Sequence, residues 1–252
     1  MMKKNLFVWF MGLVVLTVAG YAQSPGAEHE PFDKLLKKYV EKGLIRYDDL
    51  SQSPQDLSAL AQYLDTLQHQ KPSRMERKQA LAFWINLYNA ATLKLVLDHY
   101  PVKSIKDIGG FFSSPWNKQV VTIEGKELTL NQIENEIIRP EFADARIHFA
   151  LNCASLGCPP MQPFAYTGDK LDEQLDTATR ASLAMPRWLR INDEAIYVTR
   201  LFDWYKDDFI SYAGSVRAFL ARYAPEADRP LILDEKRPIR AMDYDWKLNK
   251  AK

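Results

Sequence analysis

Cysteine is scarce in this chain of 252 residues, which has only Cys153 and Cys158. Familiar catalytic signatures are missing altogether: there is no G-x-S-x-G, no G-x-x-x-x-G-K-[ST], no G-x-G-x-x-G and no H-E-x-x-H. The sequence therefore offers no serine nucleophile elbow, no phosphate-binding loop, no dinucleotide fingerprint and no zinc-protease helix. What chemistry it has must come from less common arrangements.

A net charge of one sign is also lacking. Lys and Arg number 33 against 32 Asp and Glu, which gives no reason to expect nucleic acid or an anionic membrane surface as a partner. Long hydrophobic runs are confined to the N-terminus, so we expect no later segment to cross a membrane. Almost half of the residues are hydrophobic, enough for a substantial core.

The first 22 residues are typical of a secretory signal peptide. Lys3 and Lys4 precede the apolar run 6–19, and Gly20-Tyr21-Ala22 places small residues where a signal peptidase reads them. We expect cleavage after Ala22 and a periplasmic or secreted protein without stable membrane insertion; an uncleaved N-terminal anchor is the alternative. An exported chain places its two cysteines in an oxidising compartment.

The remaining chain has the pattern of one helix-rich α+β domain over residues 31–252, preceded by a polar, disordered segment at 23–30. Helical spacing recurs along it, and the pairs 120–123 with 126–129 and 188–191 with 195–198 have the form of hairpins. No repeat or linker interrupts it. We therefore predict short antiparallel strands around a long buried helix.

That long helix begins at a predicted capping box, Ser73 with Glu76, and ends before Pro101. It is apolar nearly all round from 80 to 97, as in a helix buried on most faces. Asn86 and Asn89 lie one turn apart in this apolar surface. They either tie a neighbouring loop to the core or face a catalytic pocket.

The most informative stretch is RIHFALNCASLGCPP, residues 146–160. It has the pattern of an inner strand over 147–151 that breaks into a tight loop. His148 and Cys153 could form a nucleophilic site, although five residues apart in a strand point to opposite faces unless a turn intervenes. Cys153 and Cys158 could equally form a disulfide, and His148 could be an ordinary core residue. No second C-x-x-C or H-x-x-x-H supports metal binding, so we expect no metal and no cofactor.

Two aromatic segments have open interpretations. The loop 109–116 could cover a site or fill a core. The patch DWYKDD, residues 203–208, could serve sugar or acid–base chemistry, but the ordinary interpretation is an amphipathic helix with buried aromatics and solvated acids. The aromatic tail 240–249 is expected to dock on the body.

Taken in order, five motifs resemble the Domain of Unknown Function 547 family: FWINLYNA (83–90), IENEIIRP (133–140), RIHFALNCASLGCPP (146–160), FDWYKDDF (202–209) and YDWKLN (244–249). Bacterial members of that family are typically exported, and plant members resemble partner-binding regions. The chain departs from the family pattern at Ala154, where glycine is common, and at Gly157, where serine is common.

The family in turn resembles permuted papain-like or transglutaminase-like thiol enzymes, in which His can precede Cys. That resemblance implies a triad of Cys153, His148 and Glu134, with Cys158 as a further candidate. The first functional hypothesis is thus an exported thiol hydrolase or acyl transferase acting on a peptide or amide bond, with Cys153 as nucleophile. The second is a non-enzymatic domain that binds an envelope peptide, protein or glycan, with Cys153–Cys158 as a disulfide.

Overall fold

The computed structural model describes residues 26–110 and 113–252. The predicted signal peptide and the start of the 23–30 segment lie outside this range. The part of that segment within it is ordered, contrary to the prediction of disorder: Ala27–His29 form a 3-10 turn, η1, and His29 is buried. The reason is the contact of the His29 ring with Tyr63, whose hydroxyl lies 2.8 Å from Nδ1.

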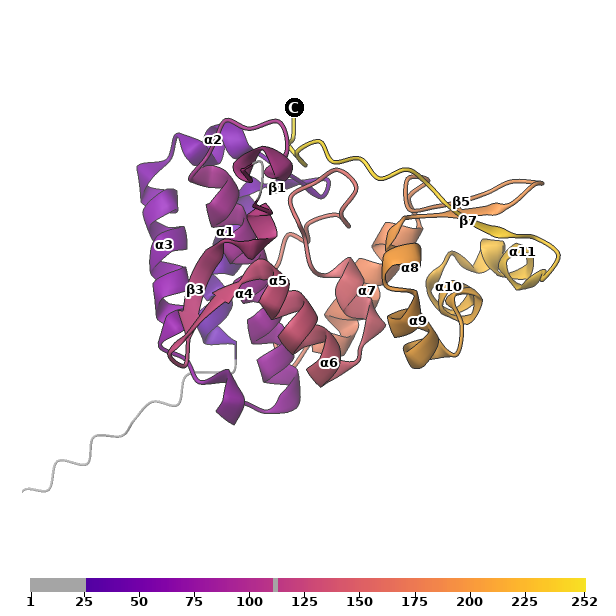
Figure 1. The fold of residues 1–252 in the computed structure, drawn as a ribbon, viewed down its shortest axis with the longest axis horizontal. Coiled ribbons are helices and arrows are strands. Elements are labelled where there is room, and N and C mark those ends of the chain that lie inside the picture. The colour runs from indigo at the N-terminus through magenta and orange to yellow at the C-terminus, as the bar shows by residue number, and fades with distance from the viewer. Residues whose placement is uncertain (1–25, 111–112) are drawn as a thin grey trace, which may run out of the picture.

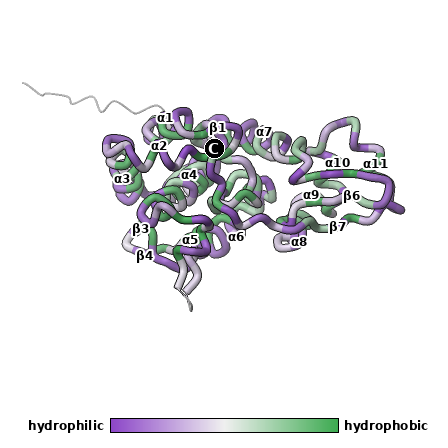
Figure 2. The backbone as a smooth tube through the Cα atoms, turned by 90° about the horizontal axis from the view of Figure 1, so that it is seen from above, coloured by the Kyte–Doolittle hydropathy of each residue, from purple (hydrophilic) through white to green (hydrophobic). Residues whose placement is uncertain are grey.

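Two hydrophobic clusters occupy opposite ends of the long axis (Figure 1). The larger cluster surrounds α4 (Arg77–Leu97). The smaller one includes residues of α8 (Leu201–Trp204), α9 (Lys206–Ala213) and α10 (Val216–Tyr223). Ile147 belongs to the first cluster and Phe149 to the second, so one short segment joins them. Residues of opposite hydropathy alternate along the helices of both halves (Figure 2), as expected for helices that cover a core.

Helices and two small hairpins build the N-terminal half. Its elements before α4 are α1 (Glu30–Tyr39), β1 (Val40–Glu41), β2 (Leu44–Ile45), α2 (Tyr47–Ser51), α3 (Pro54–Gln68) and η2 (Pro72–Arg74). After α4 come η3 (Ile105–Ile108), η4 (Pro115–Asn117), β3 (Gln119–Ile123), β4 (Lys126–Thr129), α5 (Leu130–Gln132), η5 (Ile133–Ile138) and α6 (Arg139–Phe142). The hairpin β3–β4 is antiparallel, as predicted.

The buried central helix is confirmed, with most residues from Ala80 to Val96 inside the fold. Its predicted capping box is wrong: α4 starts at Arg77, and the Ser73 hydroxyl donates to Glu124 of the β3–β4 turn instead. The expectation that no later segment could cross a membrane also needs correction. By length and composition α4 could, but 89% of its most apolar window is buried in the protein, as in the core helix of a globular fold.

The C-terminal half contains α7 (Leu171–Leu183), β5 (Leu189–Ile191), β6 (Ile196–Val198), α8 (Leu201–Trp204), α9 (Lys206–Ala213), α10 (Val216–Tyr223), η7 (Glu226–Asp228), α11 (Arg229–Leu233) and β7 (Ile239–Ala241). The hairpin β5–β6 is antiparallel as predicted, but β7 adds to β6 in parallel. The α+β class with mainly antiparallel strands around a buried helix is therefore correct. A single domain over 31–252 stays a prediction.

The segment around His148 is not a strand. Ala145–Phe149 form a 3-10 helix, η6, because the Asp144 side chain accepts from the Arg146 backbone N–H and caps its first turn. The Arg146 guanidinium then fixes the segment through ion pairs with Asp144, Asp172 and Asp176 at 2.6–2.8 Å. The apolar run that suggests a strand is explained by burial between two clusters.

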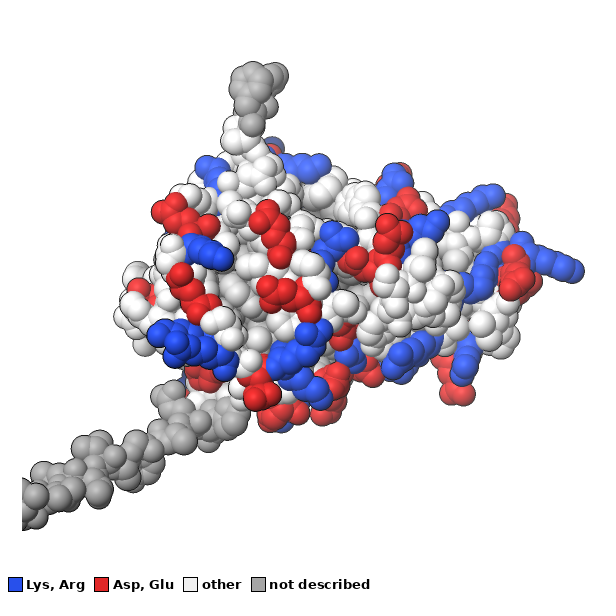
Figure 3. Space-filling model, turned by 60° about the horizontal axis from the view of Figure 1, so that its bottom comes forward, with Lys and Arg blue, Asp and Glu red and all other residues white. Residues whose placement is uncertain are grey.

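Charges of both signs are interspersed over the face seen in Figure 3, without a large field of either sign.

Candidate functional site: an aromatic pocket

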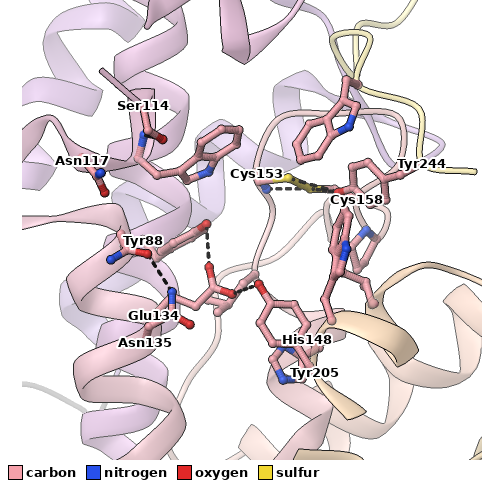
Figure 4. A pocket seen from close by; sticks show the side chains of 17 residues that line it. Tyr88, Ser114, Asn117, Glu134, Asn135, His148, Cys153, Cys158, Tyr205 and Tyr244 are labelled. Carbon is pink, nitrogen blue, oxygen red and sulfur yellow. Dashed lines mark hydrogen bonds between the residues drawn. A yellow bond between two sulfur atoms is a disulfide. The ribbon is translucent and has the colours of Figure 1, made fainter. Parts of the chain in front are cut away.

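A pocket of about 420 Å³ lies where the two halves meet, a volume suited to a small ligand. Its walls bring together residues far apart in sequence (Figure 4). The aromatic side chains that line it are Tyr88, Trp116, Trp204, Tyr205, Tyr244 and Trp246. The three residues of the predicted triad, Cys153, His148 and Glu134, line the same pocket.

Cys153 and Cys158 form a disulfide, with their Cα atoms 6.1 Å apart. Cys158 is buried and Cys153 is partly exposed to the pocket. The Tyr244 hydroxyl lies 3.3 Å from each sulfur and accepts a hydrogen bond from Ser155 at 3.0 Å. Burial raises the pKa of Tyr244, so this hydroxyl remains protonated at neutral pH and can donate to sulfur.

Asparagines hold the loop that carries the disulfide. Asn89 of α4 donates to the Ala150 carbonyl and accepts from the Asn152 backbone N–H, at 2.9 and 2.8 Å. The Asn152 side chain donates to the Pro159 carbonyl and accepts from Asn249. Asn86 makes the same kind of two-way bond with the backbone of Tyr166. Both central-helix asparagines thus tie loops to the core, and neither lines the pocket.

The C-terminal tail completes the loop's surroundings, as predicted by its aromatic composition. The backbone N–H groups of Leu156 and Gly157 donate to the carbonyls of Lys247 and Asp245, each at 2.7 Å. A Cβ atom at Gly157 would lie 2.6 Å from the Tyr244 ring. Glycine at this position therefore lets the loop lie directly against the tail, and a serine would displace the ring.

Ala154, the other departure from the family pattern, adopts a left-handed backbone conformation with φ +63°. Side chains other than glycine rarely adopt it. A glycine here would relieve that strain, which explains physically why the position favours one.

Glu134 is held by two tyrosines from different elements. Tyr88 of α4 donates to Oε2 at 3.1 Å, and Tyr205 donates to Oε1 at 2.6 Å. Burial and the Glu134 charge raise the pKa of both tyrosines, so both remain donors. The residue sits on η5, a π-helical stretch within an otherwise α-helical segment, a distortion frequent at functional sites. A capping box of Thr129 with Gln132 starts this segment.

His148 pairs with Asp208, its Nε2 lying 2.7 Å from Oδ2. The Arg139 guanidinium binds the same carboxylate in a bidentate manner, at 2.7 and 3.0 Å. Burial opposes ionisation of Asp208, but the bonds from His148 and Arg139 outweigh it and hold the pKa of that carboxyl well below its usual range. The carboxylate is therefore the acceptor, and Nε2 carries a proton. Tyr205 stacks on the imidazole with ring centroids 3.9 Å apart.

The three residues of the predicted triad thus share one pocket, but each bonds to a different partner. His148 bonds to Asp208, Glu134 to two tyrosines, and Cys153 to Cys158. In Figure 4 the disulfide faces Tyr244, whereas His148 lies with Tyr205.

Sequence reasoning missed the residues that hold the site together: Tyr88, Arg139, Tyr205, Asp208 and Tyr244. The interpretation of 203–208 as a helix with solvated acids fails for Asp208, whose side chain is 26% exposed and doubly paired. The segment is also not one continuous helix, because Tyr205 separates α8 from α9. All five residues lie within the family motifs quoted above, and that membership is the signal that could have found them.

Within residues 26–110 and 113–252, the structure has no group of three or more His, Cys, Asp or Glu side chains that could hold a metal ion. Residues 72–183 match the family described as "Protein of unknown function, DUF547". The matched segment is similar to that family and contains α4, Glu134, His148 and both cysteines. No curated protein and no solved structure matches the chain.

Proposed function

We propose that this protein is a binding domain, that the aromatic pocket is its ligand site, and that the Cys153–Cys158 disulfide fixes the loop forming one wall. The observation that carries the proposal is the pocket itself, about 420 Å³ and lined by three tryptophans and three tyrosines. Aromatic walls with a few placed polar groups are typical of small-ligand sites. The expected export from the cytoplasm agrees with this proposal, because a disulfide persists in oxidising compartments.

The wall is built to keep its shape. The disulfide loop is fixed by hydrogen bonds to Asn89 of α4, by hydrogen bonds to the C-terminal tail and by the disulfide itself. A pocket that is already ordered loses little conformational entropy when a ligand enters. Trp204 lines the pocket but is 46% exposed, so a bound ligand would cover apolar surface at this residue.

Ligand-observed NMR with cationic, neutral and anionic fragments tests the proposal on the unreduced protein. Asn117→Trp is the matched obstruction, because Asn117 lines the pocket and is exposed. Gln55→Trp, on the exposed side of α3, is the control. We expect at least one fragment class to bind the native and control proteins and to be lost in Asn117→Trp. If no fragment distinguishes the native from the obstructed protein, the binding proposal fails.

A thiol hydrolase or acyl transferase acting on a peptide or amide bond is the second candidate. It is favoured by the presence of Cys153, His148 and Glu134 in one pocket and by the Asp208 carboxylate that orients the imidazole. It requires prior reduction by a dithiol, because the nucleophile must be a thiolate. It also requires a rearrangement that brings His148 to Cys153.

Hydrolysis of an activated acyl ester after reduction separates the two candidates. The enzyme proposal predicts that reduced Cys158→Ser retains activity and reduced Cys153→Ser loses it, with alkylation of Cys153 abolishing turnover. Equal, background rates in the reduced native protein and both variants would exclude it. The binding proposal is unaffected by that result.

A further inference from the structure

We propose that the pocket selects a ligand with a compact positive charge on an apolar stem, such as a primary or methylated alkylammonium group. This inference rests on the proposed binding function and names the chemistry of its ligand. It follows from the charge of the lining, the state of Glu134 and the aromatic walls.

The charge of the lining is one-sided. Among the described residues that line the pocket, Glu134 is the only carboxylate, and there is no Lys or Arg. The remaining polar lining consists mainly of amides and hydroxyls, with His148 committed through Nε2 to Asp208. An anionic ligand would therefore meet a like charge and no compensating Lys or Arg among the lining residues.

Glu134 is oriented but not neutralised. Its two hydrogen-bond donors are the uncharged hydroxyls of Tyr88 and Tyr205, one on each oxygen. The neighbouring cation, Arg139, directs its donors to Asp208 and to the Asn135 side chain. A carboxylate oxygen accepts more than one bond, so each retains capacity for a donor within the pocket. Among the described residues no Lys or Arg side chain donates to the Glu134 carboxylate, and Arg139 attracts it only at longer range. A cationic ligand would give this carboxylate a direct charged partner.

The aromatic walls suit a cation with an apolar stem. Trp116, Trp246, Tyr244 and Trp204 form a continuous series in which neighbouring ring centroids lie 4.5–5.7 Å apart. The protein already places one ammonium on this series, with the Lys106 Nζ atom 3.6 Å from the Trp246 ring centroid. Aromatic faces attract ammonium groups, and the attraction strengthens out of water. Glu134 lines the same pocket as these rings, and Figure 4 shows its carboxylate between the hydroxyls of Tyr88 and Tyr205.

Calorimetric titration with four probes tests the inference: n-butylammonium, the near-isosteric neutral n-butanol, the anion butyrate and the neutral sugar methyl glucoside. We expect n-butylammonium to bind most tightly. Glu134→Gln should weaken it by about tenfold or more, with binding of n-butanol little changed. Glu136→Gln is the matched control, since it removes the same charge from an exposed position on the same helical segment.

Trp204→Leu provides a second variant, because Trp204 is exposed and its loss should not unfold the protein. We expect it to weaken n-butylammonium by several fold. Tighter binding of the alcohol, the sugar or butyrate than of the ammonium would overturn the cationic preference and leave the binding function standing. So would an unchanged affinity for n-butylammonium in both Glu134→Gln and Trp204→Leu. Absence of binding by all four probes would also overturn the inference, while the fragment comparison with Asn117→Trp decides separately whether the pocket binds ligands.

Discussion

His148 Nε2 lies 2.7 Å from Asp208 Oδ2, a bond between residues sixty positions apart. It joins the 3-10 turn before the disulfide loop to helix α9 of the other half, beside the pocket. Arg139 adds a bidentate contact to the same carboxylate. Three segments therefore meet at one acid, which sets where Tyr205 stands over the imidazole.

Replacing Asp208 by Asn should destabilise the protein by about 2 kcal/mol, because Arg139 would lose a partly buried charged partner. Urea denaturation monitored by circular dichroism measures this change. Asp207→Asn is the control, an exposed acid directly preceding it. Equal stability of the two variants would show that the three-segment junction contributes nothing to folding.

The two hydrogen bonds that hold the disulfide loop to Asn89, here called the Asn89 clamp, predict a larger loss of stability than the loss expected for Asp208→Asn. Asn89→Ala would leave the Ala150 carbonyl and the Asn152 N–H buried without partners, each costing about 1–3 kcal/mol. We expect a loss of about 2–4 kcal/mol in the free energy of unfolding, with faster hydrogen exchange in 150–153. Asn131→Ala, at an exposed position, should change stability by less than about 0.5 kcal/mol. Slow exchange retained in Asn89→Ala would contradict the clamp.

Replacing Ala154 by glycine should not lower the free energy of unfolding, unlike the two replacements above. Releasing a left-handed alanine gains about 1–2 kcal/mol, and the lost methyl group costs somewhat less than 1 kcal/mol. Ala154→Gly is thus expected to be neutral or stabilising by up to about 1 kcal/mol. Ala150→Gly, at ordinary backbone angles with φ −109°, should destabilise. Thermal melting compares the two, and a destabilised Ala154→Gly would show that its methyl packing outweighs the strain.

His29 makes stability depend on pH. Burial, partly opposed by the Glu28 charge, lowers the pKa of His29 from 6.5 to about 4. The unfolded chain therefore binds the proton more readily, and stability falls as the pH drops from 6.5 towards 4, by up to about 3 kcal/mol. His29→Gln should flatten this part of the profile, whereas His69→Gln, at an exposed site, should not. Urea midpoints across pH 4–7 measure both, and parallel profiles for native and His29→Gln proteins would refute the assignment.

Local patterns predicted the elements that depend on neighbours in sequence. The apolar circumference of α4 and the hairpin β3–β4 are of this kind. The prediction of a strand over 147–151 is wrong, because burial between two clusters produces the same apolar run as an inner strand. A single hydrogen bond, from the Arg146 backbone N–H to the Asp144 side chain, caps the 3-10 helix that forms there instead.

The same distinction between local patterns and long-range contacts applies to the candidate site. His148, Glu134 and the cysteines could be named from composition and the family motifs. Their partners could not, because Asp208, Tyr205 and Tyr244 approach from helices and a tail that only the tertiary fold brings near. A sequence shows which groups can bond, but their pairing depends on long-range geometry.

The indole N–H signals of the tryptophans test the central claim, that the aromatic pocket binds an alkylammonium ligand, most directly. Trp116, Trp204 and Trp246 line the pocket, whereas Trp84 and Trp188 are buried elsewhere. In a two-dimensional ¹⁵N–¹H titration of the unreduced protein with n-butylammonium, the three pocket signals should shift together and saturate. The signals of Trp84 and Trp188 should stay in place. Saturating shifts confined to Trp84 or Trp188, or no shift at any of the five, would contradict the account.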